Sequence, residues 1–101
     1  MTLSQRSQLR WKNQGYLVAN VEKWNSFTKT RHDLYGVIDL LAIGNGETVA
    51  IQTTSKSNMS SRIKKIEDSD ALPIMLSSHW RVCVEGWFKE KNRWTVKEFE
   101  F

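Results

Sequence analysis

The 101 residues include 15 Lys and Arg against 11 Asp and Glu, a formal net charge of +4, and 40% of them are hydrophobic. A chain of this length has room for one domain, residues 1–101, and its apolar content is that of a folded protein, which excludes a disordered chain and a two-lobed enzyme. The moderate basic excess fits either a polyanionic partner or an ordinary solvated surface.

Cys83 is the single cysteine, so neither an internal disulfide nor a cysteine–histidine zinc cluster is expected. A reducing cytoplasm is the predicted compartment. The polar N-terminal stretch is not that of a signal peptide, and the longest apolar run, residues 34–43, is interrupted by Asp39 and is too short to span a bilayer. The sequence therefore predicts no membrane partner, and no motif indicates an organic cofactor.

The first predicted element is a helix over residues 3–14, with Ser4 as its N-cap and Gly15 as its stop. Few of its positions are apolar, so we expect it to lie on the surface of the protein. Residues 16–22 are rich in strand formers and predict a strand. The polar residues 25–32 predict a loop.

Two further strands are predicted over residues 36–43 and 47–54, separated by Asn45 and Gly46. An Asn-Gly pair between two β-branched runs predicts a two-residue type I′ hairpin turn, because both central positions need positive φ. In the register that this turn sets, Asp39 lies opposite Gln52.

The remaining residues predict two helical segments and a closing hairpin. The first helix, over residues 58–66, has Ser57 or Asn58 as its cap and an apolar stripe at spacings of three and four. The other predicted segments are a short helix around 73–76 and strands at 80–88 and 93–101 joined by a turn at 89–92. The order of elements is that of an α/β protein.

Asp39, Gln52 and Thr54 form a polar cluster on otherwise apolar strands. Directly opposed residues of an antiparallel pair have Cβ atoms about 4.5–5.5 Å apart, so oxygens of Asp39 and Gln52 can both reach one hard cation such as Mg²⁺ or Mn²⁺. A carboxylate in apolar surroundings needs a cation, a basic partner or a raised pKa. The alternative is a solvated Asp39 on a half-exposed hairpin.

The chain carries an Asp on the first strand of a hairpin and an amide on the second, and a helix follows. This arrangement resembles the PD-(D/E)XK nuclease superfamily, which includes restriction endonucleases and Holliday-junction resolvases. The chain resembles most its short phage-encoded members. The resemblance rests on VEKWN (21–25), DLYGVID (33–39), IQTTS (51–55), SN (57–58), RIKKI (62–66) and EGW (85–87).

The resemblance implies a restriction-endonuclease-like α-β-β-β-α-β core with a mixed central sheet and an added C-terminal β-hairpin strand. It implies a Mg²⁺-dependent or Mn²⁺-dependent endodeoxyribonuclease that hydrolyses phosphodiester bonds of DNA, with branched or phage DNA as candidate substrates. A homodimer is expected, because one centre cuts one strand. A phage-encoded protein acting in the cytoplasm of a bacterial host is the implied setting.

Two positions depart from the superfamily pattern. Gln52 stands where most members carry Glu or Asp, although Mrr-type restriction enzymes also carry Gln there, and an amide oxygen can still bind a metal. Thr54 stands where the catalytic lysine is expected, which opens the alternative of a degenerate nuclease-fold protein that binds DNA or a protein without cleavage. Lys56 or Arg62 is the candidate to supply the missing charge.

Glu22 and Asp33 are the two remaining acids that can reach this site, and either would form a carboxylate pair with Asp39. Asp33 can equally be an Asx-turn residue or an ion-pair partner of Arg31, and Glu22 can equally be a surface residue. The five tryptophans can stack on bases or pack in the core. The candidate DNA-contacting residues are polar or basic: Arg31, Ser55, Lys56, Asn58, Arg62, Lys64 and Lys65.

Overall fold

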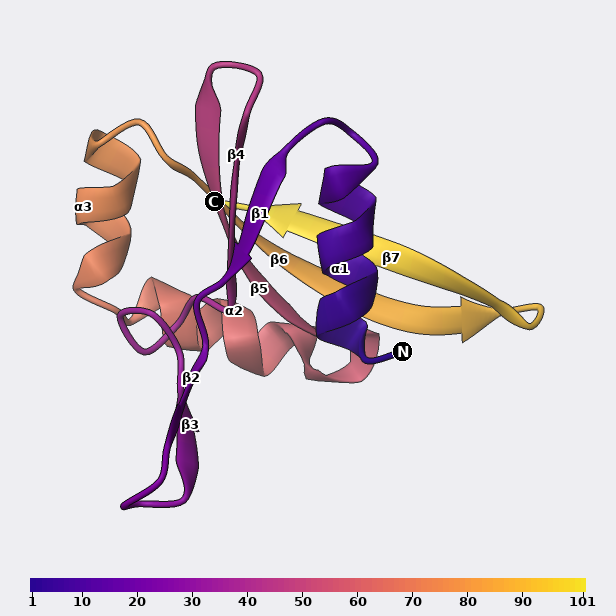
Figure 1. The fold of residues 1–101 in the computed structure, drawn as a ribbon, viewed down its shortest axis with the longest axis horizontal. Helices are drawn as coiled ribbons and strands as arrows, with labels where there is room; N and C mark the ends of the chain where they lie inside the picture. Colours follow the sequence, from indigo (N-terminus) through magenta and orange to yellow (C-terminus); the bar gives the residue numbers. More distant parts are fainter.

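A mixed five-stranded sheet organises the computed structural model, which describes residues 1–101 (Figure 1). Its strands, in spatial order, are β1 (Leu17–Asn20), β4 (Leu40–Gly44), β5 (Glu47–Ser55), β6 (Arg81–Glu90) and β7 (Arg93–Glu100). Strands β5 and β6 run parallel, and every other neighbouring pair runs antiparallel.

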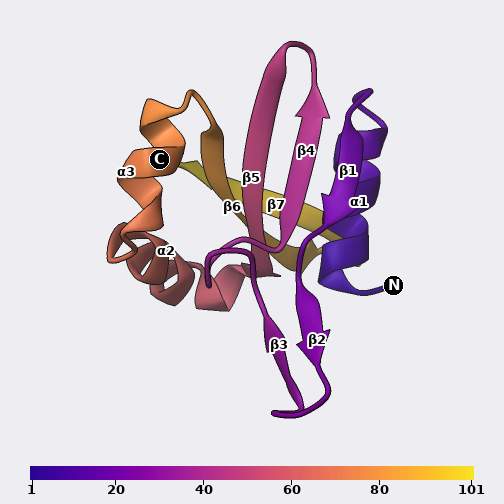
Figure 2. The ribbon, with the colours of Figure 1, turned by 60° about the vertical axis from the view of Figure 1, so that its left-hand side comes forward.

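Helices cover both faces of the sheet (Figure 2). The helix α1 (Leu3–Lys12) lies on one face. The 3-10 helix η1 (Lys56–Asn58), α2 (Met59–Glu67) and α3 (Ala71–Ser77) connect the two parallel strands and cover the other face, because parallel neighbours require a long crossover. The predicted α/β class is therefore confirmed, and none of the helices has the length and apolar character needed to cross a membrane.

Alternation of side chains along the central strands builds one core on each face of the sheet. Val49 and Ile51 on β5 pack on the side of α1, together with the buried ring of Trp11. Ala50, between them, faces α2 and packs in a cluster with Met59 and Ile66. The candidate site described below lies at the end of β5, where the buried positions carry polar instead of apolar side chains.

The helix α1 begins at Leu3 as predicted, ends at Lys12 rather than at residue 14, and is anchored more deeply than predicted. Its N-cap is Thr2 rather than Ser4, since the Thr2 hydroxyl accepts a hydrogen bond from the N–H of Gln5 (3.1 Å) and the Gln5 side chain accepts one from the Thr2 N–H (2.8 Å). Ser7 and Trp11 are buried against the sheet. The helix therefore lies on the surface of the protein with one polar and one aromatic anchor.

The Asn45-Gly46 turn and the predicted hairpin register are confirmed. Asn45 and Gly46 have φ of 51° and 76°, and the pairing runs from Gly44 opposite Glu47 to Leu40 opposite Ile51. The next position along this ladder places Asp39 beside Gln52.

Two predicted strands are shorter than expected. The strand predicted over 36–43 begins at Leu40, because Tyr35 and Gly36 have φ of 54° and 76° and turn the chain. The first strand ends at Asn20, whose side-chain oxygen accepts a hydrogen bond from the Glu22 N–H (2.9 Å) and bends the backbone. Both irregular segments lead into the candidate site.

The loop predicted over 25–32 is instead a separate two-stranded hairpin, β2 (Lys23–Asn25) paired with β3 (Thr30–His32). We call residues 23–32 the arm. It projects away from the main sheet in both ribbon views (Figures 1 and 2). The Asn25 side chain shapes its turn by accepting hydrogen bonds from the N–H groups of Phe27 (2.9 Å) and Thr28 (3.3 Å).

The turn of the closing hairpin is shorter than predicted. Strand β6 continues to Glu90, and the turn consists of Lys91 and Asn92, with φ of 51° and 64°. As a result β6 extends past the end of β5 and, with β7, forms a second projection from the sheet (Figure 1).

Gly86→Ala is expected to destabilise the fold by about 1–3 kcal/mol through overpacking. A Cβ at Gly86 would clash with Met59 Sδ and lie 3.1 Å from Lys56 Cα, so the buried Met59 side chain would have to shift and the backbone of η1 would have to give slightly. Urea denaturation measures the loss. The double variant Gly86→Ala/Met59→Ala should be less destabilised than the sum of its single changes, and strict additivity would contradict this explanation.

Candidate metal centre

Asp39, immediately before β4, and Gln52, on β5, lie side by side in the interior. Their side chains are 5% and 3% exposed. Gln52 Nε2 donates a hydrogen bond to Asp39 Oδ2 at 2.6 Å, and the Thr53 N–H donates to the same oxygen at 3.0 Å. Asp39 is therefore not the solvated residue of the alternative interpretation, and its carboxyl group is held in a fixed orientation.

Two more carboxyl groups converge on Asp39. Glu22, Asp33 and Asp39 each offer an oxygen, and these three oxygens lie within 4.8 Å of one another. Glu22 directly precedes β2 and Asp33 directly follows β3. Both predicted candidates thus reach the site together, and they come from the two ends of the arm.

The electrostatic surroundings of Asp39 disfavour its ionised form. The pKa of Asp39 is raised to about 8, mainly by burial and further by the hydrogen bond with Asp33 and the nearby charges of Asp33 and Glu22, while the Thr53 N–H acts in the opposite direction. The cation that pairs with this cluster is Arg31, which lies 3.4 Å from Glu22, and its side chain is 73% exposed. The three acids are therefore not neutralised by a buried basic side chain. A bound cation would relieve this repulsion.

The amide of Gln52 supplies an independent indication of a ligand. Its Oε1 atom is buried and has no hydrogen-bond partner, a state that costs about 1–3 kcal/mol. An amide oxygen beside carboxylate oxygens is the donor set that Mg²⁺ and Mn²⁺ prefer. The residues present therefore fit a hard divalent cation, with Asp39, Asp33 and Glu22 as its candidate ligands. The Gln52 oxygen would join them after a turn of the amide, because Nε2 is the atom that faces Asp39 in this structure.

The position expected for the catalytic lysine carries no charge. Thr54 lies two residues after Gln52 on the same face of β5, is 7% exposed, and pairs with Gly86 of β6. Lys56 does not continue this strand face, because β5 ends at Ser55 and Lys56 begins η1. Its Nζ atom lies 4.4 Å from the centroid of the Phe88 ring on β6.

The predicted DNA-contacting residues belong to four elements, β3, β5, η1 and α2. Ser55, Lys56 and Asn58 lie where β5 passes into η1, and the Ser55 hydroxyl is hydrogen-bonded to that of Ser57 (3.1 Å). Arg31 lies on the arm. The others lie along α2, which is on the sheet face of Gln52: Arg62, Lys64 and Lys65. Lys64 also pairs with Asp68 at 3.5 Å, a contact between exposed side chains that phosphate can replace.

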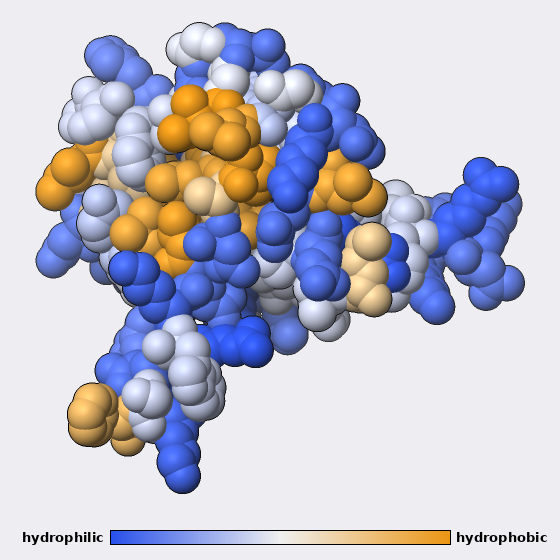
Figure 3. Space-filling model, in the orientation of Figure 1, coloured by the Kyte–Doolittle hydropathy of each residue, from blue (hydrophilic) through white to orange (hydrophobic).

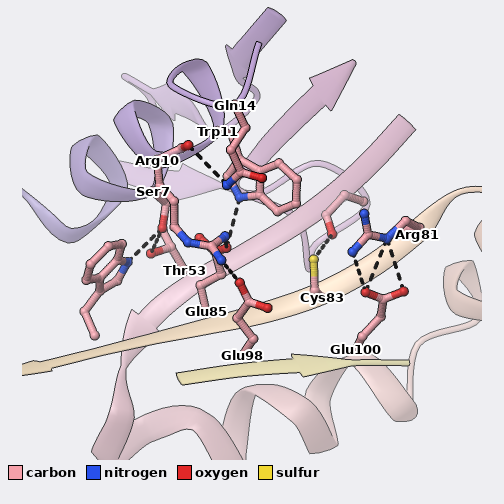
Figure 4. A network of polar contacts seen from close by, with 12 residues as sticks. Ser7, Arg10, Trp11, Gln14, Thr53, Arg81, Cys83, Glu85, Glu98 and Glu100 are labelled. Atoms are coloured by element: carbon pink, nitrogen blue, oxygen red, sulfur yellow. Dashed lines mark hydrogen bonds and ion pairs between the residues drawn. The ribbon is translucent and has the colours of Figure 1, made fainter. Parts of the chain in front are cut away.

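A polar chain on the opposite face of the sheet supports the site, and the sequence gives no signal for it. Trp87 Nε1 donates to Ser7 Oγ (2.8 Å), and the Ser7 hydroxyl donates to Thr53 Oγ1 (3.0 Å) (Figure 4). Thr53 is the residue whose N–H holds Asp39. These partners are 80 and 46 residues apart in the chain, so only the fold brings them together.

Comparison of the chain with known protein families, curated proteins and solved structures found no match.

Proposed function

We propose that this protein is a divalent-metal-dependent endodeoxyribonuclease with a restriction-endonuclease-like core. The observation that carries the proposal is the buried carboxyl group of Asp39, which lies close to those of Glu22 and Asp33 and accepts a hydrogen bond from the amide nitrogen of Gln52. The succession α1, β1, β4, β5, α2 and β6 supports the proposed core, with β7 as the added C-terminal strand. A net charge of +4 is consistent with a DNA substrate.

The roles of the residues follow from their positions. A bound Mg²⁺ or Mn²⁺ would supply a Lewis acid for the phosphate and lower the pKa of a bound water. Asp39 would hold it in an orientation fixed by the Thr53 N–H, and Glu22 and Asp33 would add negative charge. The basic side chains of α2 would bind the phosphate backbone of DNA.

A second copy of the chain is part of the proposal where both strands are cut. A single centre of this kind hydrolyses one phosphodiester bond at a time. A homodimer with two-fold symmetry places two equivalent centres on the two strands of DNA.

A second function, DNA binding without cleavage, is favoured by one specific observation. Thr54 supplies only a hydroxyl where the superfamily lysine is expected, and the ammonium of Lys56 lies over Phe88. A neutral hydroxyl stabilises negative charge in a transition state poorly. The two functions differ in one measurable property, which is metal-dependent hydrolysis.

Nicking of supercoiled plasmid in Mg²⁺ or Mn²⁺ tests the proposal. We expect cleavage that EDTA abolishes and that Asp39→Asn lowers by at least about 100-fold, because a centre without its buried carboxylate loses the cation. Asp68→Asn, which changes an exposed acid directly after α2, is the matched control and should retain activity.

The possible results separate the two functions. DNA binding that depends on salt, without hydrolysis of duplex, single-stranded or branched DNA, would favour the binding protein. Nicking that persists undiminished in Asp39→Asn would exclude the metal centre described above.

A further inference from the structure

The arm carries positive charge and almost no buried surface. Among residues 23–32 are Lys23, Lys29 and Arg31 and no acid, and all of these residues except Asn25 are exposed. The arm pairs only with itself, through β2 and β3. An isolated hairpin of this kind is only marginally stable. The arm makes no strand pairing with the main sheet, so its surface is available to a partner.

Two aromatic rings are presented to solvent on this basic hairpin. Phe27, in the turn of the arm, is 98% exposed, and Trp24, on β2, is 62% exposed. The surface of the arm is otherwise hydrophilic, with a small hydrophobic patch at its far end (Figure 3). Isolated rings among cations do not form an apolar surface for a protein partner, but they match nucleic acid, in which bases stack on aromatic rings and phosphates pair with cations.

The cross-strand pairing places a ring and a cation next to each other. Trp24 is directly opposite Arg31, so their side chains share one face of the arm, and Glu22, two residues before Trp24, pairs with Arg31 at 3.4 Å. A base stacked on Trp24 would have its phosphate within reach of Arg31. Because Glu22 also belongs to the acidic cluster, the contact connects this face of the arm to the candidate metal centre.

The arm is attached at the metal centre by both of its ends. Glu22 and Asp33 flank it, and Phe27 lies about 15 Å farther out at the usual rise of a strand. A strand of nucleic acid bound along the arm would therefore lead into the acidic cluster. The rings of duplex bases already stack on one another, so exposed Trp and Phe gain most from bases that are unpaired.

From these contacts we propose that the arm is a binding element for unpaired nucleotides, with Trp24 and Phe27 stacking on bases and Lys23, Lys29 and Arg31 contacting phosphates. One consequence of this inference rests on the proposed function: a nuclease with this arm would act on DNA that has unpaired bases beside the bond that is cut. Binding by the arm itself does not require the metal.

Fluorescence anisotropy in EDTA tests the arm separately from the metal centre. The probes are a fluorescein-labelled 20-nucleotide oligo(dT) and a labelled 20-base-pair duplex. We expect wild type to bind oligo(dT), and we expect Trp24→Ala and Phe27→Ala each to weaken that binding about tenfold while duplex affinity changes less than about twofold. Lys29→Ala should reduce the salt dependence of log affinity by about 0.7.

Trp94→Ala is the matched control, because Trp94 is also exposed (39%) but has the guanidinium of Arg6 4.3 Å from its ring and lies on β7. It should leave oligo(dT) affinity within about twofold of wild type. Equal losses for Trp94→Ala and the arm variants, or unchanged oligo(dT) affinity in Trp24→Ala/Phe27→Ala, would overturn the proposal. Arm-dependent oligo(dT) binding by a protein that never nicks plasmid would support the arm and reject the nuclease.

Discussion

Asp39→Asn is expected to make the metal-free protein more stable than wild type at pH 8 and to abolish its stabilisation by Mg²⁺. Asparagine keeps the shape of the carboxyl group and can still accept the Thr53 N–H, but it carries no charge. In wild type, ionising Asp39 places a charge in a buried site beside Glu22 and Asp33. The substitution removes that cost together with the cation ligand.

The pH dependence follows from the direction of the pKa shift. The pKa of Asp39 is raised from 3.8 to about 8 on folding, so the folded state holds its proton more tightly than the unfolded chain. The associated stability is fully present below pH 3.8 and is lost as pH rises toward 8. Relative to Asp39→Asn, metal-free wild type should lose a few kcal/mol across this window, and saturating Mg²⁺ should restore part of the loss at pH 8.

Thermal and urea unfolding between pH 4 and 9, in EDTA and in Mg²⁺, measure this difference. Subtracting the variant from wild type cancels the titration of groups that the two proteins share. Asp68→Asn, which removes an exposed carboxylate, is the matched control and should not be more stable than wild type at pH 8 in EDTA. A wild type that is more stable than Asp39→Asn at pH 8 in EDTA would mean that the folded protein accommodates the ionised carboxylate without a cation.

The central hairpin could be predicted from sequence because its determinants are local. Asn45 and Gly46 adopt the positive φ that the type I′ turn needs, and the register of β4 and β5 follows from that turn alone. The juxtaposition of Asp39 with Gln52 depends on nothing else. The amphipathic α2 could be predicted for the same reason, since its apolar stripe is continuous in sequence.

The arm could not be predicted, because its residues lack the signal on which strand prediction depends. Strands are identified by alternation of buried and exposed positions, and β2 and β3 have no buried position. Their pairing is specified instead by backbone hydrogen bonds and by the Asn25 side chain in the turn. The same absence of burial is what makes this segment available to a ligand.

Membership of the acidic cluster was only partly predictable. The sequence leaves Glu22 and Asp33 as alternatives, because their position depends on where the arm leaves and rejoins the sheet. The fold brings both to Asp39. Lys56, the candidate to supply the missing charge, begins η1 instead of continuing β5, and its ammonium lies over the Phe88 ring.

The buried charge on the other face of the sheet leads to the largest expected loss of stability. Glu85 on β6 is fully buried, and its Oε2 atom accepts hydrogen bonds from Arg10 Nη1 (2.6 Å) and Trp11 Nε1 (2.9 Å) (Figure 4). Its other oxygen, Oε1, is buried without a partner. Arg10, which also pairs with Glu98, is the only cation bound to this carboxylate. Removing that cation would leave a buried charge with a single donor.

Arg10→Met is therefore expected to destabilise the protein by about 3–5 kcal/mol, since breaking a buried ion pair costs far more than the pair contributes. Arg10→Met/Glu85→Gln should recover part of the loss, because no net charge then remains in the site. Glu98→Gln, which changes the exposed partner of Arg10, should cost less than about 1 kcal/mol. Urea denaturation of the three variants at pH 7 measures these differences. If Arg10→Met lowered the free energy of unfolding less than Glu98→Gln, the Trp11 N–H alone would suffice to stabilise Glu85. In that case α1 would be held by its apolar contacts rather than by this ion pair.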